Sequence, residues 1–131
     1  MIGIDTNVLV RYSAQDDATQ SPQATQLIES LTTESPGYIS LVTVIELVWV
    51  LMGCYSCSRE DIVEVLEILL RTKELMVAEA ETLWSALRLF KSSKADFADC
   101  VIERMAHAAG CDYTVTFDRA AAKYCGMKLI A

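Results

Sequence analysis

The chain has 131 residues, a formal net charge of −7 and 53% apolar residues, with no repetitive or low-complexity segment. This composition excludes a disordered chain and a repeat array, and the length predicts a single domain over residues 1–131. Its longest apolar run, 41–54, is interrupted by Glu46 and is too short to span a bilayer. Because its first residues also lack the basic segment and cleavage site of a signal peptide, we expect a cytoplasmic protein.

The amino-terminal part of the chain predicts two short strands and two helices. The apolar run 1–4 stops at Asp5, as a buried parallel strand would. Ser21 and Pro22 are typical of the cap and first position of a helix, which we expect to reach Leu31. After the Pro36-Gly37 break, the sequence predicts a strand at 38–39 and a helix over 42–52.

The rest of the chain continues the alternation of helices and strands. We expect helices over 58–70, 83–90, 97–109 and 119–125, and strands over 75–78, 113–117 and 127–130. Strands that alternate with helices predict an α/β fold, in which helices cover both faces of a parallel sheet.

Several carboxylates stand where a predicted strand gives way to a helix. Asp5 follows the first strand and Asp118 follows the strand at 113–117, while Asp96 opens the helix that contains Asp99. The carboxyl ends of parallel strands meet at one edge of a sheet, so we expect Asp5 and Asp118 to share that edge. Taken singly, each of the three helix-opening aspartates is equally explained as a helix cap.

Glu46 gives a different kind of signal, because it stands in the apolar helix at 42–52. The surrounding residues are apolar on every side, and we therefore expect this carboxylate to be buried. A buried charge needs compensation, for which a bound cation is the economical source and a long-range ion pair the alternative.

Asp96 and Asp99 lie three residues apart, so their like charges share one helix face. Together with Glu46, Asp5 and Asp118 they predict a site for a hard divalent cation, Mg²⁺ or Mn²⁺ and not zinc. His107 lies two turns beyond Asp99, too far to share the ion, and we expect it at or near the surface.

The five cysteines and the charge balance bear on other functions. Cys54 and Cys57 form a Cys-x-x-Cys pair, but without a second close pair we expect ordinary reduced thiols. The negative net charge argues against a nucleic-acid partner. Residues 85–131, however, carry seven basic residues, and this part becomes locally basic once a metal neutralises its acids, so RNA is not excluded. The candidates for contacts with an RNA backbone are Arg11, Arg88, Lys91, Lys94 and Arg119.

Four segments of the sequence resemble the motifs of PIN domains. They are Ile4–Val10, Ile39–Leu47, Ala95–Ile102 and Thr114–Arg119, and they occur in the family's order over residues 2 to about 130. The compact length and the Ala-Asp-Phe-Ala-Asp segment at 95–99 are most similar to VapC toxins of toxin–antitoxin pairs.

The resemblance implies a PIN-like three-layer α/β/α sandwich with a central five-stranded parallel sheet. It also implies a homodimeric endoribonuclease that cleaves RNA, often tRNA or rRNA, with Mg²⁺ or Mn²⁺ in an acidic cleft, and that a VapB-like antitoxin inhibits. Carried over by motif, the catalytic and metal-binding residues are Asp5, Glu46, Asp99 and Asp118, with Asp96 as a neighbour that is also a candidate ligand. The supporting polar residues are Thr6, Asn7, Ser40 and Thr116.

Several alternatives stay open at this point. Either Asp96 or Asp99 contacts the ion, one or two ions bind, and either Asp99 or Glu46 orients the attacking water. A PIN nuclease of RNA processing without an antitoxin and a catalytically inert PIN module are the alternative functions. A phosphatase of the haloacid-dehalogenase type is disfavoured, because it needs an aspartate where this chain has Asn7. No Ser-His or Cys-His pair suggests a covalent intermediate.

Overall fold

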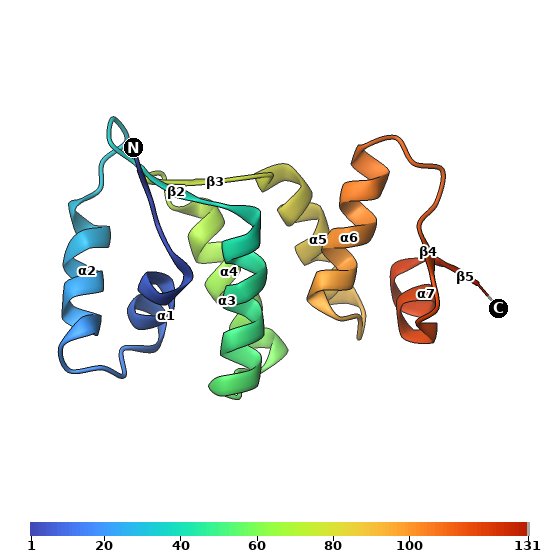
Figure 1. Cartoon of the computed structure of the whole chain (residues 1–131), viewed down its shortest axis with the longest axis horizontal. Helices are drawn as coiled ribbons and strands as arrows, with labels where there is room; N and C mark the ends of the chain where they lie inside the picture. The colour runs from blue at the N-terminus through green and yellow to red at the C-terminus, as the bar shows by residue number, and fades with distance from the viewer. Residues whose placement is uncertain (131) are drawn as a thin grey trace. The chain divides into compact units, whose positions relative to one another are not determined.

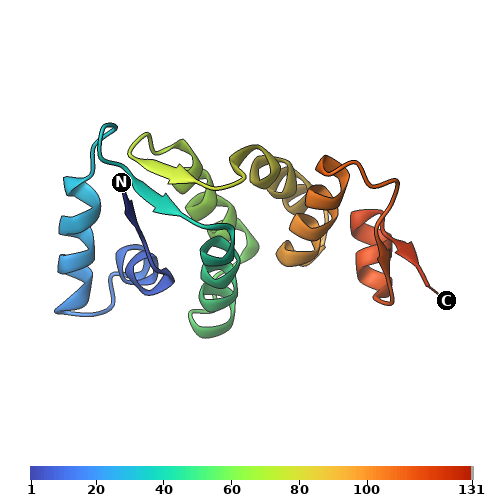
Figure 2. The same cartoon turned by 45° about the horizontal axis from the view of Figure 1, so that its top comes forward.

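The computed structural model describes residues 1–130, which fall into two compact units, one over residues 1–78 and one that begins at Glu79. The first unit contains β1 (Ile2–Gly3), α1 (Thr6–Ala14), α2 (Gln20–Ser30), β2 (Gly37–Ile39), α3 (Leu41–Cys54), α4 (Arg59–Arg71) and β3 (Leu75–Val77). The second contains α5 (Ala80–Ser92), α6 (Phe97–Ala108), β4 (Val115–Thr116), α7 (Arg119–Cys125) and β5 (Lys128–Leu129). Figures 1 and 2 show these elements in chain order from blue to red.

The first unit is built on a parallel sheet with the strand order β1-β2-β3. Ile2 pairs with Gly37, and Gly37 pairs in turn with Leu75. α1 packs against α2 and α3, and α3 packs against α4 (Figure 1). The buried side chains Leu9, Ile39 and Leu47 come from α1, β2 and α3, so the helices and the sheet share one core.

Gly37 shows how closely this sheet packs. A Cβ atom at this position would collide with the side chains of Ile4 and Leu31. The first position of β2 therefore needs glycine for space, because interiors packed at crystal density leave no room for one more carbon atom.

In the second unit two helices pack face to face beside a two-stranded parallel sheet. Phe90 of α5 meets the ring of Phe97 of α6 edge-on, with the ring centroids 5.5 Å apart. Leu83 and Leu87 of α5 and Cys100 of α6 are also buried. β4 pairs with β5 in parallel, with Val115 opposite Lys128.

The predicted alternation of helices with parallel strands is confirmed. The five strands are paired as sheets of three and two, and a single five-stranded sheet stays an implication of the family resemblance. Two predicted helix starts were wrong: α5 begins at Ala80 and not at residue 83, and Ser21 is not the cap of α2. α2 begins at Gln20, where Asp17 Oδ1 accepts from the amides of Thr19 and Gln20, and Ser21 lies inside the first turn. Among residues 1–130 no helix is both long and apolar enough to cross a membrane.

Candidate functional site: two groups of carboxylates

Asp5 occupies the turn between β1 and α1. Its Oδ1 accepts a hydrogen bond of 2.9 Å from the amide of Thr6, and its extended backbone makes it the N-cap of α1. The carboxylate is exposed and uses one oxygen in this cap. Asp5 is therefore a helix cap, as its position in the sequence allowed. The cap leaves the second carboxylate oxygen of Asp5 available.

Glu46 lies on the exposed side of α3, so the prediction that it is buried was wrong. Val42 and Trp49, four residues before it and three after it, are 68% and 75% exposed, while Val44, Leu47 and Val48 are buried. Residues with this spacing share one helix face. The helix looked buried on all sides because its exposed face also carries apolar side chains.

Thr6 connects the two acidic residues of the first unit. Its hydroxyl donates a hydrogen bond of 2.8 Å to Glu46 Oε1, and its amide donates to Asp5. Thr6 is only 7% exposed, so its position is fixed by packing. Asp5 and Glu46, 41 positions apart in the chain, are thus joined through one residue, and we call them the amino-terminal carboxylates.

Ser40 and Asn7 are the other polar candidates of this unit. Ser40 is the N-cap of α3, with its Oγ accepting from the amide of Thr43 at 3.2 Å and lying 3.1 Å from the hydroxyl of that residue. Asn7 is exposed in the first turn of α1. Ser40, which directly follows β2, therefore sets where the helix of Glu46 begins.

The second unit holds Asp96, Asp99 and Asp118, which we call the carboxy-terminal carboxylates. Asp96 is the N-cap of α6 and accepts from the amide of Asp99 at 3.3 Å. Asp99 is half-buried, and its pKa is raised first by burial and then by the negative charges of Asp96 and Asp118. Asp99 therefore lies within electrostatic reach of both other aspartates.

Asp118 is fixed at the start of α7 in the same way. Its Oδ1 accepts from the amides of Ala120 and Ala121 at 2.7 and 3.1 Å. Thr116 Oγ1 accepts from the amide of Asp118 at 2.9 Å, so the predicted supporting threonine orders the turn that carries the carboxylate.

The donor set suits a hard cation. Asp5, Glu46 and Asp118 each use one oxygen in the bonds above, and within residues 1–130 their second oxygens accept no hydrogen bond. Such oxygens are the ligands that Mg²⁺ prefers. Among the same residues, however, no group of three or more His, Cys, Asp or Glu is placed to hold one ion. The predicted five-carboxylate metal site therefore stays a prediction.

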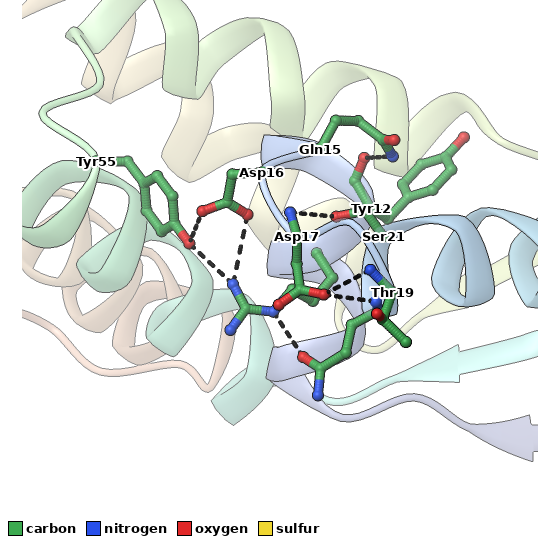
Figure 3. Close-up of polar contacts among 9 residues, drawn as sticks. Tyr12, Gln15, Asp16, Asp17, Thr19, Ser21 and Tyr55 are labelled. Atoms are coloured by element: carbon green, nitrogen blue, oxygen red, sulfur yellow. Dashed lines mark hydrogen bonds and ion pairs between the residues drawn. The ribbon is translucent and has the colours of Figure 1, made fainter.

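Arg11 makes hydrogen bonds and an ion pair within the protein, whereas a residue that served only to bind RNA would be free in solvent. Its Nε donates to Gln20 Oε1 at 2.8 Å, and its Nη1 lies 3.2 Å from the hydroxyl of Tyr55 and 3.4 Å from Asp16 Oδ1. Tyr55 also donates to Asp16 Oδ2 at 2.9 Å (Figure 3). Arg11 therefore ties α1 to the loops that follow α1 and α3.

The other predicted RNA-binding residues, Arg88, Lys91, Lys94 and Arg119, are exposed. Lys91 and Lys94 line one hollow with Lys123, a lysine that sequence reasoning did not single out. His107 is exposed, as expected, and all five cysteines are free thiols.

Comparison with known proteins covers almost the whole chain. A family model described as "PIN domain" matches residues 2–127. A protein named VapC ribonuclease, from Aquifex aeolicus (strain VF5), is 28% identical over 118 residues, which are 88% of this chain and 86% of that protein. The family match spans both units and includes all five carboxylates of the two groups.

Proposed function

This chain belongs to the PIN-domain family, and from that premise we propose that it is a metal-dependent endoribonuclease. The observation that carries the proposal is the bond from Thr6 to Glu46, which holds the amino-terminal carboxylates together on separate elements. A turn that served only to cap α1 would need Asp5 but not this second contact. The likeness to a protein named VapC ribonuclease supports RNA as the substrate.

In this proposal both groups of carboxylates serve one cleavage reaction. Asp5, Glu46, Asp99 and Asp118 would hold Mg²⁺ or Mn²⁺, with Asp96 as a further candidate ligand. When bound, the ion lowers the pKa of a water molecule and neutralises charge on the phosphate. Thr6 orients Glu46, Asp96 orders the first turn of α6, and Thr116 orders the turn of Asp118.

A carboxylate of the chain also acts as the general base for the attacking water. Either Glu46, whose rotamer the Thr6 hydroxyl fixes, or Asp99 accepts the proton of the attacking water. No covalent intermediate is needed, because water attacks the phosphorus directly. The bond between the phosphorus and one ribose oxygen breaks, and that oxygen leaves and takes up a proton from solvent. The products are one RNA fragment with a terminal phosphate and one with a terminal hydroxyl.

We further propose that the chain is the toxin of a VapBC-type pair, acting as a homodimer on tRNA or rRNA and inhibited by a VapB-like antitoxin. The named relative supports this assignment over a PIN nuclease of RNA processing. A short neighbouring reading frame with a DNA-binding amino-terminal segment would decide for the toxin. The absence of such a reading frame, together with full RNA cleavage by the protein when it is produced alone in cells, would decide for RNA processing.

The purified protein tests the nuclease proposal directly. It is incubated with total tRNA and rRNA in Mg²⁺ or Mn²⁺ and, in parallel, in EDTA. We expect cleavage with either ion and none in EDTA. A catalytically inert module would cleave under neither condition, and its unfolding temperature would not rise with added Mg²⁺, whereas a metal site raises it.

A further inference from the structure

A hollow in the second unit gathers positive charge in a chain that is acidic overall. It has a volume of about 610 Å³ and is lined by Leu89, Lys91, Ser92, Ser93, Lys94, Lys123 and Tyr124. Three of these seven residues are lysines and none is acidic, although the chain carries 18 acidic and 11 basic residues. The lining is therefore positively charged, and it would favour an anionic ligand.

Helix ends explain part of this pattern but not all of it. Lys91 and Lys123 lie in the last turns of α5 and α7, where a cation is favoured by the helix dipole. Lys94 lies beyond the end of α5, in the segment before α6, and gains nothing from that effect. The dipole also gives no reason for the two helix ends and this segment to line the same hollow.

The hollow also contains an aromatic ring. The Lys123 ammonium lies 5.2 Å from the centroid of the Tyr124 ring, a cation–π distance. Tyr124 is half-buried, so the ring restrains the lysine that covers it. Lysines beside an aromatic ring are the elements with which proteins bind single-stranded nucleic acids, through phosphates and base stacking.

We propose that this hollow, formed by Lys91, Lys94, Lys123 and Tyr124, binds the phosphate backbone of single-stranded RNA. The proposal rests on the proposed function for its substrate, and it adds Lys123 and Tyr124 to the residues that contact RNA. An acidic peptide is the other ligand with matching charge. RNA is favoured because the hollow offers an aromatic ring next to the cations.

The test compares two double variants of the full chain with equal charge. Lys94→Ala/Lys123→Ala removes two cations of the hollow. Lys73→Ala/Lys128→Ala removes two exposed lysines outside it, and Lys128 lies 4.6 Å from the Tyr113 ring, so this control also loses one cation–π pair. Binding of a fluorescent single-stranded RNA is measured in EDTA, which prevents cleavage, at several salt concentrations.

We expect the hollow variant to bind RNA roughly tenfold more weakly than the control at low salt. Its slope of log affinity against log salt should fall by roughly 1.4, since each phosphate contact to a single strand contributes about 0.7. Equal affinities and slopes in the two variants would overturn the proposal. So would wild-type protein that binds an acidic peptide of equal charge but no RNA.

Cleavage measured separately keeps this inference distinct from the proposed function. Wild-type protein that binds RNA through the hollow but cleaves nothing in Mg²⁺ would refute the nuclease and leave the hollow in place. Wild-type protein that cleaves RNA while both double variants bind it equally would refute the hollow and leave the nuclease in place.

Discussion

The hydroxyl of Thr6 donates a 2.8 Å hydrogen bond to Glu46, and Thr6 is the residue whose amide Asp5 caps. Through its backbone amide and its hydroxyl, this one residue therefore links a carboxylate on α3 to a carboxylate at the start of α1. Preorganised polar groups of this kind reduce the rearrangement needed when charge develops in a transition state.

Replacing Thr6 tests whether this link matters for catalysis. Thr6→Val keeps the branched shape but removes the hydroxyl, and we expect RNA cleavage to fall at least tenfold. Stability should fall by only about 1 kcal/mol, the typical net value of one hydrogen bond. The measurements are kcat on a defined RNA and the free energy of unfolding. Thr6→Ser retains a hydroxyl and should restore most of the activity, and wild-type kcat in Thr6→Val would contradict the role.

Asp99 predicts a pH-dependent stability in the metal-free protein. Its pKa is raised in the folded state by burial and by Asp96 and Asp118. The folded state therefore binds the proton more tightly than the unfolded state, and this stabilisation is complete below the ordinary carboxyl pKa and lost as pH rises through the raised value. At neutral pH the ionised side chain destabilises the fold.

We therefore expect Asp99→Asn to raise the unfolding temperature in EDTA at pH 7, while it abolishes metal-dependent cleavage. The difference from wild type should disappear below the ordinary carboxyl pKa, where both side chains are neutral. Asp112→Asn, an exposed position in the same unit, is the control and should leave both properties unchanged. A lower unfolding temperature for Asp99→Asn at pH 7 would contradict the electrostatic account.

A matched pair of glycine variants tests the packing of the first unit. Gly37→Ala would place a Cβ against the Ile4 and Leu31 side chains, and we expect a loss of about 1–3 kcal/mol from overpacking. A Cβ at Gly53, in α3, meets nothing within 4 Å, and Gly53→Ala should stabilise the helix by up to about 1 kcal/mol. Denaturant unfolding measures the change in the free energy of unfolding for both variants. Equal changes would show that the packing around Gly37 has room for a Cβ atom.

Much of the fold follows from local patterns in the sequence. The apolar run before Asp5, the capping box that starts at Ser58 and the break at Gly37 locate elements because their causes lie within a few residues. The helix α1 was missed as a bounded element, although Asp5 was recognised as a possible cap. Pairing of five strands into sheets depends on distant contacts, and no local pattern specifies it.

The site was predicted less completely, for the same reason. Asp5, Asp96 and Asp118 were identified because each follows a strand or opens a helix. The environment of Glu46 was wrong, since the apolar exposed residues Val42 and Trp49 hid which face of α3 is buried. The bond from Thr6 to Glu46 and the hollow around Lys123 join residues far apart in the chain, which one sequence without relatives does not reveal.

The central claim, that Asp5 serves metal-dependent RNA cleavage and does not merely cap α1, is tested most directly by Asp5→Asn. Asparagine caps a helix about as well as aspartate but carries no charge, so the fold should keep its stability while the metal ligand is lost. Asp61→Asn, which removes the charge of the third residue in the capping box of α4, is the control. We predict that Asp5→Asn unfolds at the wild-type temperature in EDTA and cleaves no RNA in Mg²⁺, while Asp61→Asn cleaves normally. Wild-type cleavage by Asp5→Asn would contradict the account.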